Sequence, residues 1–212
     1  MNRLIFFFIL AITLIIYSCS RTKETPYPEG TLKSKQEYKG KKLDGVSTWF
    51  YKNGGKQLEV VYKDDVPHGP STRWYFSGAK ELQESYIDGK RNGLARKWDL
   101  QGKLIEEISY KNDTLHGPYT LYHESTEIKV EGYYNMGLFD SIWTYYDISG
   151  MKVGDGKYVA GKGVQRTYFP NGQLKAVVSY ENNKKNGYEI LYDRKGNEFS
   201  RVLYKDDVAL SE

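Results

Sequence analysis

The stretch YKDDVPHGPS at residues 62–71 occurs again as YKNDTLHGPY at residues 110–119. Two near-copies of this length in a chain of 212 residues indicate internal repetition. Counting outward from Gly69 and Gly117, an equivalent residue returns every 24 positions, except between Ser141 and Gly163, which are 22 apart. These repeat anchors are Gly45, Gly69, Gly93, Gly117, Ser141, Gly163 and Gly187. The chain is therefore built of units of about 24 residues.

Three more positions recur in the same register. Nine residues after the anchors stand Gly54, Gly78, Gly102, Thr126, Gly150, Gly172 and Gly196. Seventeen residues after them stand Tyr62, Tyr86, Tyr110, Tyr134, Tyr158, Tyr180 and Tyr204. Five residues after them lies an aromatic set, here called the ladder: Phe50, Trp74, Trp98, Tyr122, Tyr146, Tyr168 and Tyr192. One structural unit repeated seven times would explain all three sets.

Each unit has the pattern of a β-hairpin. The residue after the anchor is apolar in every unit but the last, and the ladder ring follows at even spacing, which places both on one face of a strand. Dipeptides such as Asn53-Gly54 supply the positive φ of a tight turn, and a second strand runs to the tyrosine. We predict an all-β fold, an elongated, twisted antiparallel β-meander of about seven hairpin repeats, solenoid-like, with about fifteen strands.

YIDGKRNG at 86–93 and YKNDTLHG at 110–117 resemble the MORN repeat, most closely its bacterial variant, whose members are often labelled antitoxins of toxin–antitoxin systems. The resemblance covers about residues 28–207 and implies an elongated β-meander that mediates contacts. A propeller is the competing architecture. Because its blades need about 40–50 residues, two units would form one blade, giving at most four.

The first residues resemble an export signal. Residues 1–18 carry one arginine and an apolar run of thirteen residues, about 20 Å as a helix, which favours a signal peptide over a spanning helix. Ile16-Tyr17-Ser18-Cys19 resembles a bacterial lipobox, although Tyr17 departs from the usual small residue. The resemblance implies lipid attachment at Cys19, the chain's single cysteine. The alternative is an uncleaved anchor with an incidental cysteine.

The expected domains follow from this signal. Residues 19–27 are polar and read as a tether, and 28–212 form the repeat domain, which begins with a degenerate half unit containing Gly30 and Tyr38. Ser20 follows the cysteine, and the lipoprotein resemblance then implies the outer rather than the inner membrane. We expect a lipid-anchored protein of the bacterial cell envelope.

Composition and motifs argue against nucleic acid, metals and catalysis. The 31 basic and 27 acidic residues are intermingled without a basic run. His68 and His116 each precede an anchor, where a turn role explains them, and His123 is isolated, so a metal site lacks ligands. Residues 156–162 have the spacing of a phosphate loop, but Gly163 replaces the required Ser or Thr. The paired carboxylates, Asp64-Asp65 and Asp206-Asp207, fall in turns. We predict no enzyme, no catalytic residue and no cofactor.

The ladder and its neighbours suggest where a partner binds. We expect ladder rings of successive units to stack as the core. Tyr51, Tyr75 and Phe169 lie one residue beyond the ladder, so we place the partner-binding surface on their face, opposite the ladder. In the alternative, the ladder or the outer tyrosines form a concave strip for an extended polypeptide or glycan.

Two function classes follow from this reading. The first is a lipid-anchored interaction or scaffold protein with a protein partner, one form of which is an immunity or antitoxin-like protein. The second is a cell-wall or glycan-binding module that uses exposed aromatic residues.

Overall fold

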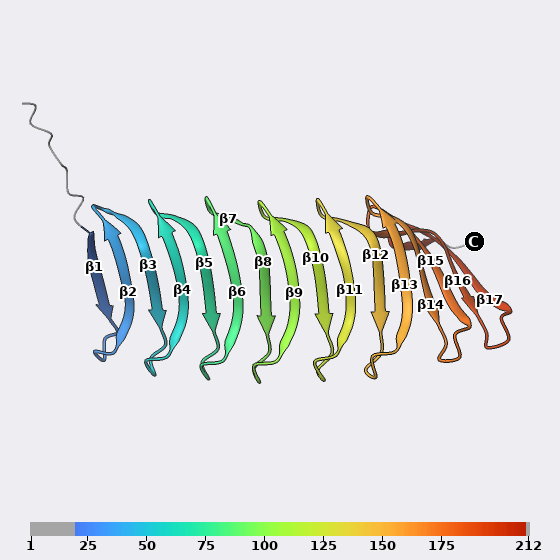
Figure 1. The fold of residues 1–212 in the computed structure, drawn as a ribbon, viewed down its shortest axis with the longest axis horizontal. Coiled ribbons are helices and arrows are strands. Elements are labelled where there is room, and N and C mark those ends of the chain that lie inside the picture. Colours follow the sequence, from blue (N-terminus) through green and yellow to red (C-terminus); the bar gives the residue numbers. More distant parts are fainter. Residues whose placement is uncertain (1–19, 211–212) are drawn as a thin grey trace, which may run out of the picture.

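The computed structural model describes residues 20–210, which form one open antiparallel sheet of 18 strands. Neighbouring strands pair in sequence, except that β7 and β8 both pair with β6, and the hairpins follow one another along the long axis (Figure 1). The predicted elongated β-meander is confirmed. The first nine strands are β1 Ser20–Pro26, β2 Leu32–Lys39, β3 Lys42–Phe50, β4 Lys56–Lys63, β5 Val66–Trp74, β6 Lys80–Ile87, β7 Lys90–Arg91, β8 Gly93–Trp98 and β9 Leu104–Lys111. The others are β10 Thr114–Tyr122, β11 Ile128–Asn135, β12 Leu138–Tyr146, β13 Lys152–Val159, β14 Lys162–Tyr168, β15 Leu174–Glu181, β16 Lys184–Tyr192, β17 Glu198–Lys205 and β18 Val208–Leu210.

Two kinds of turn alternate along the two edges of the sheet. The glycine turn follows the ladder residue: Gly54 donates its amide to the carbonyl of Tyr51 at 2.9 Å and has a φ of +82°. The tyrosine turn follows the repeat tyrosine, and its two central residues, Asp64 and Asp65, have φ of 50° and 72°. Two consecutive positive φ values define the type I′ turn that matches the twist of a hairpin.

The start of the sheet differs from the predicted tether and half unit. Ser20–Pro26 form β1, which pairs with β2 over seven positions, so the described part of the segment 19–27 is a strand and the first repeat is a full hairpin. The physical reason is that exposed polar and β-branched residues, with a proline at the end, suit an edge strand as well as they suit a linker. The predicted signal peptide, residues 1–18, and Cys19 lie outside the described residues.

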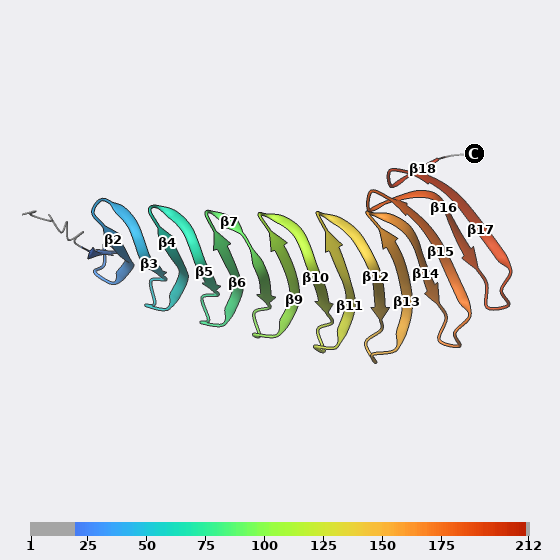
Figure 2. The ribbon, with the colours of Figure 1, turned by 45° about the horizontal axis from the view of Figure 1, so that its top comes forward.

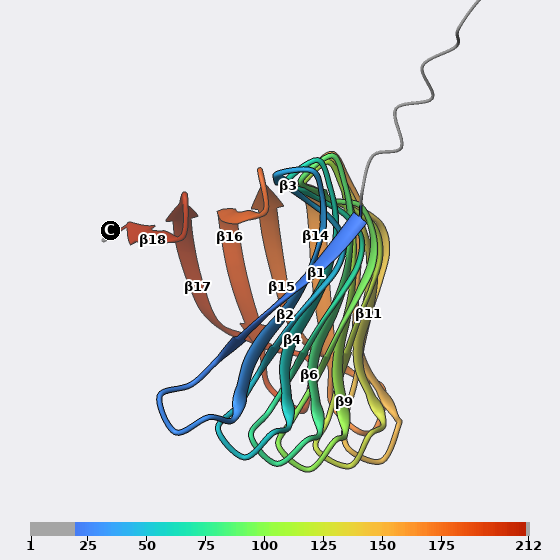
Figure 3. The ribbon, with the colours of Figure 1, turned by 90° about the vertical axis from the view of Figure 1, so that its left-hand side faces the viewer.

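The core lies on one face of the sheet. Seen end-on in Figure 3, β2–β13 superpose as one curved band of strands. Cross-strand pairing places Ser47, Val60, Ser71 and Glu84 in one row, and Trp49, Leu58, Arg73 and Leu82 in the next row of the same face. All the buried apolar side chains of the described core belong to this face: Val60, Ala95, Trp143, Tyr158, Ala176 and Val178.

The ladder occupies the opposite face, and its rings do not stack on one another. No ring contact found in residues 20–210 joins two ladder residues; instead Tyr122 donates its hydroxyl to Glu107 at 2.9 Å, and Tyr146 donates to Glu131 at 2.5 Å. The prediction of a stacked core was wrong. Because a ladder position returns only on every second strand, about 10 Å away, a ring meets the side chain of the intervening strand before it can reach the next ring.

The sheet changes direction at β13–β14, where the repeat is shortened to 22 residues. In β4–β5 the pairing runs from Val60↔Ser71 to Tyr62↔Pro67, so β5 carries two extra residues in a bulge, and β2–β3, β9–β10, β11–β12 and β15–β16 show the same shift. The β13–β14 pairing is continuous. Since bulges add local bend and twist, the missing one redirects the chain, and Figures 2 and 3 show β15–β18 swung away from the line of β2–β13.

One side chain fixes this corner. In three tyrosine turns an aspartate, Asp65, Asp113 or Asp207, accepts the amide 22 residues before it, as Asp65 does from Leu43 at 2.7 Å. The equivalent turn residue at the corner is Gly161, which like Gly89 and Gly137 has no side-chain acceptor. Asn183 from the next turn takes its place: it accepts the amide of Phe139 at 2.7 Å and donates to the carbonyl of Gly137 at 2.8 Å.

Candidate functional site

Among the described residues, a hollow lies on the concave face over β3–β6. It has a volume of about 520 Å³, and we call it the open trough. Its lining residues are Trp49, Gln57, Leu58, Val60, Tyr62, Pro67, Ser71, Arg73, Leu82, Glu84 and Tyr86. The volume is within the range of about 300–1,000 Å³ typical of ligand pockets, and the lining mixes apolar residues and rings with a few polar groups.

One repeat position differs between the hollow part of the concave face and the part filled by rings. Two residues after the anchor stand Ser47, Ser71 and Ala95 in the first units, all small and buried. The next two units carry Tyr119 and Trp143 there. Small residues leave the trough open over β3–β6, whereas rings occupy the same space further along.

In the part that we call the filled trough, over β10–β13, aromatic side chains pack on one another. Trp143 is 3% exposed and stacks on Tyr119, with 5.6 Å between ring centroids. It lies so close over Gly132 that a Cβ there would overlap the indole ring. Tyr134 meets the indole edge-on at 5.0 Å. The protein's own rings therefore take the place that is vacant in the open trough.

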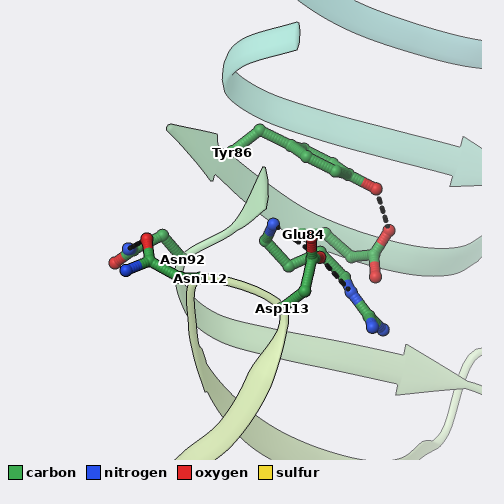
Figure 4. Close-up of polar contacts among 6 residues, drawn as sticks. Glu84, Tyr86, Asn92, Asn112 and Asp113 are labelled. Carbon is green, nitrogen blue, oxygen red and sulfur yellow. Dashed lines mark hydrogen bonds and ion pairs between the residues drawn. The ribbon is translucent and has the colours of Figure 1, made fainter. Parts of the chain in front are cut away.

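The open trough carries a defined polar end. Tyr86 donates its hydroxyl to Glu84 at 3.0 Å (Figure 4). Burial and the neighbouring carboxylate of Glu84 raise the pKa of Tyr86 to about 12, so the hydroxyl stays protonated and keeps the carboxylate oriented. Arg73 is half exposed, with its guanidinium 3.8 Å from Glu81. A cation and a carboxylate are thus both available on this surface.

The next tyrosine turn adjoins this polar end. Asp113 accepts from the backbone amide of Arg91 at 2.9 Å and from its Nε at 3.1 Å, and Figure 4 shows Asp113 beside the strand of Tyr86. These two bonds lower the pKa of Asp113, and the bond from the backbone amide contributes most. The Arg91 guanidinium lies 4.1 Å from the ring centroid of Tyr110. The pair therefore holds the turn beyond β6 in place.

The three predicted partner-binding residues lie on the glycine-turn edge. Tyr51 donates its hydroxyl to the carbonyl of Trp74 at 2.7 Å, and Tyr75 donates to Trp98 at 2.9 Å. Phe169 lies beyond the corner, beside a smaller hollow that also includes Met151. The structure does not bring the three rings together, and their role in binding stays a prediction. Tyr27, which the sequence reasoning missed, makes the same bond to Phe50 at 2.7 Å, and its 24-residue offset from Tyr51 could have revealed it.

The histidines take part in turns. His68 Nδ1 lies 3.2 Å from Asp88 Oδ1, His116 Nδ1 accepts the amide of Met136 at 3.4 Å, and His123 Nε2 lies 3.0 Å from the carbonyl of Tyr146. Within residues 20–210 there is no cluster of three or more His, Cys, Asp or Glu placed to hold a metal ion.

The structure also bears on the phosphate-loop spacing at residues 156–162 and on membrane-spanning helices. Residues 156–162 form the end of β13 and a hairpin turn, so the strand-to-helix geometry of a phosphate loop is missing there. In the described part of the chain, no helix has the length and apolar character to cross a membrane.

The main lining residues of the open trough were not predicted. Trp49, Arg73 and Glu84 occupy positions that vary between repeats, and the sequence reasoning followed the positions that stay constant. The signal was the change from small to large residues two positions after the anchor.

Comparison with known proteins agrees with the repeat pattern. Residues 43–64, 91–112 and 162–182 match a family model described as "MORN repeat variant". Those three stretches are similar to MORN-variant repeats. Each match spans one hairpin, from its first strand to the tyrosine turn. Repeats of this kind indicate a binding or scaffold role.

The other comparisons add little. A search of curated proteins found no match. Among solved structures, one similar chain belongs to "Crystal structure of GtfA/B complex bound to UDP and GlcNAc", at 15% identity and a TM-score of 0.24. The similarity covers 55% of this chain and 23% of that one. A TM-score this low does not relate the two folds.

Proposed function

We propose that this chain is a lipid-anchored binding protein of the bacterial cell envelope that holds its partner in the open trough. The observation that carries the proposal is the open trough itself, an unfilled hollow of about 520 Å³ on a face that the chain's own rings fill over β10–β13. A repeat scaffold of this shape presents an extended surface, and concave surfaces of repeat proteins are common binding faces.

The anchoring part of the proposal rests on Ile16-Tyr17-Ser18-Cys19. It predicts that Cys19→Ala leaves an uncleaved precursor that no longer incorporates labelled palmitate, whereas Ser18→Ala, which keeps a small residue before the cysteine, is labelled like the wild type. Equal labelling of Cys19→Ala would contradict lipid attachment. Fractionation of the membranes tests whether the protein then reaches the outer membrane, as Ser20 suggests.

The fold adds an orientation to this anchor. β1 begins at Ser20, directly after Cys19, and Ser20 pairs with Lys39 beside the first tyrosine turn. An acylated Cys19 would therefore hold the tyrosine-turn edge near the bilayer, with the glycine turns pointing away. Since β1 is paired along its length, little free chain remains to change this orientation.

The binding part is tested by crosslinking in native membranes. A photo-crosslinking amino acid at Arg73, on the concave face, should give a discrete adduct. The matched control at Thr72 places the same probe one residue away on the opposite face and should give none. Identical products at both positions would move the partner away from the open trough.

An immunity or antitoxin-like role is a narrower form of this function. Because the export signal would take the chain out of the cytoplasm, its toxin would be one met in the envelope. The role predicts a toxin as the adduct at position 73 and a growth defect when the chain is deleted in the presence of that toxin. If the partner is not a toxin, the immunity role is contradicted and the binding role still stands.

A further inference from the structure

The open trough combines ring faces with planar polar side chains. Trp49, Tyr62 and Tyr86 contribute aromatic rings to its lining, and Gln57, Arg73 and Glu84 contribute amide, guanidinium and carboxylate groups. Aromatic faces pack against flat apolar surfaces, and these planar groups can each form two hydrogen bonds with neighbouring hydroxyls.

The backbone beneath the trough is already paired. β4 and β5 each pair with a neighbour on both sides, β3 pairs with β2 and β4, and β6 pairs with β5, β7 and β8. A peptide that binds by adding a strand needs an open sheet edge with free amides and carbonyls. The trough offers side chains alone, so its ligand has to be recognised through ring stacking and side-chain hydrogen bonds.

The charge of the lining excludes strongly ionic ligands. Arg73 and Glu84 are its two charged residues and have opposite signs. A phosphate-rich or sulfated polymer needs several cations that Arg73 alone does not supply, and a cationic ligand would meet Arg73 as well as Glu84.

The filled trough indicates the shape of the missing occupant. There a flat ring, Trp143, lies over Gly132 and against Tyr119. In the open trough Ser71 stands at the repeat position of Trp143 and Val60 at that of Gly132, and rings such as Tyr86 complete the lining. A flat, six-membered unit with an apolar face and polar rim would fill this space as Trp143 fills its own.

We propose that the open trough binds a neutral, hydroxyl-rich glycan chain. Its pyranose rings lie against Trp49, Tyr62 and Tyr86, and its hydroxyls meet Arg73, Glu84 and Gln57. The inference rests on the proposed function as an envelope binding protein and names the chemical class of its ligand.

The test is titration calorimetry of the detergent-solubilised full chain with three neutral hexasaccharides, cellohexaose, chitohexaose and maltohexaose. At least one should bind with a Kd below about 1 mM. Ser71→Tyr introduces the ring that Tyr119 provides at the same repeat position two units further on, and it should weaken that binding by about tenfold or more. Thr72→Tyr is the matched control, because it adds the same ring on the opposite face, and it should bind like the wild type.

Other outcomes overturn the proposal. If none of the three sugars binds, or if Ser71→Tyr binds as well as Thr72→Tyr while both show the wild-type circular dichroism, the trough is not a site for neutral glycans. A polypeptide adduct at position 73 without any sugar binding would assign the trough to a protein. A wild-type chain that takes up no palmitate, or a Cys19→Ala variant labelled as strongly as the wild type, would contradict the anchor. The titration would still be readable, so failures of the two proposals can be told apart.

Discussion

The open and filled halves of the trough have the same backbone plan and differ in what covers the concave face. Over β3–β6 the position two residues after the anchor is serine, and the surface is a groove. Over β10–β13 it is Tyr119 or Trp143, and the surface is an aromatic core. The comparison teaches that one repeat sheet can have a filled aromatic core over some units and an open groove over others, with a change at one repeat position, while the hairpin plan stays the same.

The largest expected loss of stability comes from removing an aromatic ring from the filled trough. Trp143→Ala removes a buried indole packed on Gly132 and Tyr119 and should cost about 3–5 kcal/mol of the free energy of unfolding. Trp49→Ala removes the same side chain from the open trough, where it is partly exposed, and should cost clearly less.

Hydrogen exchange distinguishes these two variants by region. Trp143→Ala should lower amide protection in β10–β13 first, because stability in a repeat protein is carried by neighbouring units. Equal losses from the two substitutions, spread evenly over the sheet, would mean that the two halves do not differ in the way proposed.

The second effect concerns shape. Replacing residues 159–162, VAGK, with the six residues KDDVPH found at 63–68 restores the regular spacing at the corner. The bulge should return and bring β14–β18 into line with β2–β13. The Asn183 hydrogen bonds to Phe139 and Gly137 would be lost, which should cost about 1–3 kcal/mol of the free energy of unfolding. The new aspartate should offset part of this cost by accepting the amide of Phe139.

Small-angle X-ray scattering checks the change in shape. The maximum dimension should increase in this variant. The reciprocal variant, VAGK in place of residues 63–68, should decrease it by adding a second corner in the open half. Unchanged scattering from both would show that the two-residue difference does not determine the bend.

The sequence was sufficient for the fold but not for its faces. A constant period, positive-φ dipeptides and repeat tyrosines are local signals, and they predicted hairpins and turns correctly. Which face is buried depends on curvature. That property follows from bulges such as the one after Val60, which the pattern of Tyr62 and Gly69 does not reveal. The prediction that the ladder forms the core is therefore wrong, and the positions that form the open trough vary between repeats, so the constant pattern does not mark them.

The third effect separates the polar end of the open trough from the rest of the sheet. The folded-state pKa of Tyr86, about 12, is above the ordinary value of 10.0, because burial and then Glu84 disfavour the phenolate. Its contribution to stability is therefore present below about pH 10 and is lost as the pH rises toward 12. In Tyr86→Phe the urea midpoint should fall less between pH 10 and pH 12 than in the wild type. Glu84→Gln should reduce the fall only in part, because the Tyr86 hydroxyl is still buried. A fall as steep in Tyr86→Phe as in the wild type would assign the loss to other tyrosines.

The smallest effect tests one turn against its neighbour. Thr126 occupies the glycine-turn position with a φ of 74°, a left-handed conformation that is unfavourable for a β-branched residue. Gly102, one unit earlier, has a φ of 80° at the same position. Thr126→Gly removes the strain but also increases the entropy of the unfolded chain, so we expect a net gain of about 0.5–1 kcal/mol. Gly102→Thr introduces the same strain at the boundary of the two halves and should cost about 1 kcal/mol or more. Urea unfolding monitored by circular dichroism measures both changes in stability. If both substitutions stabilised the protein, the positive φ of this turn would not be the reason that glycine recurs at this position.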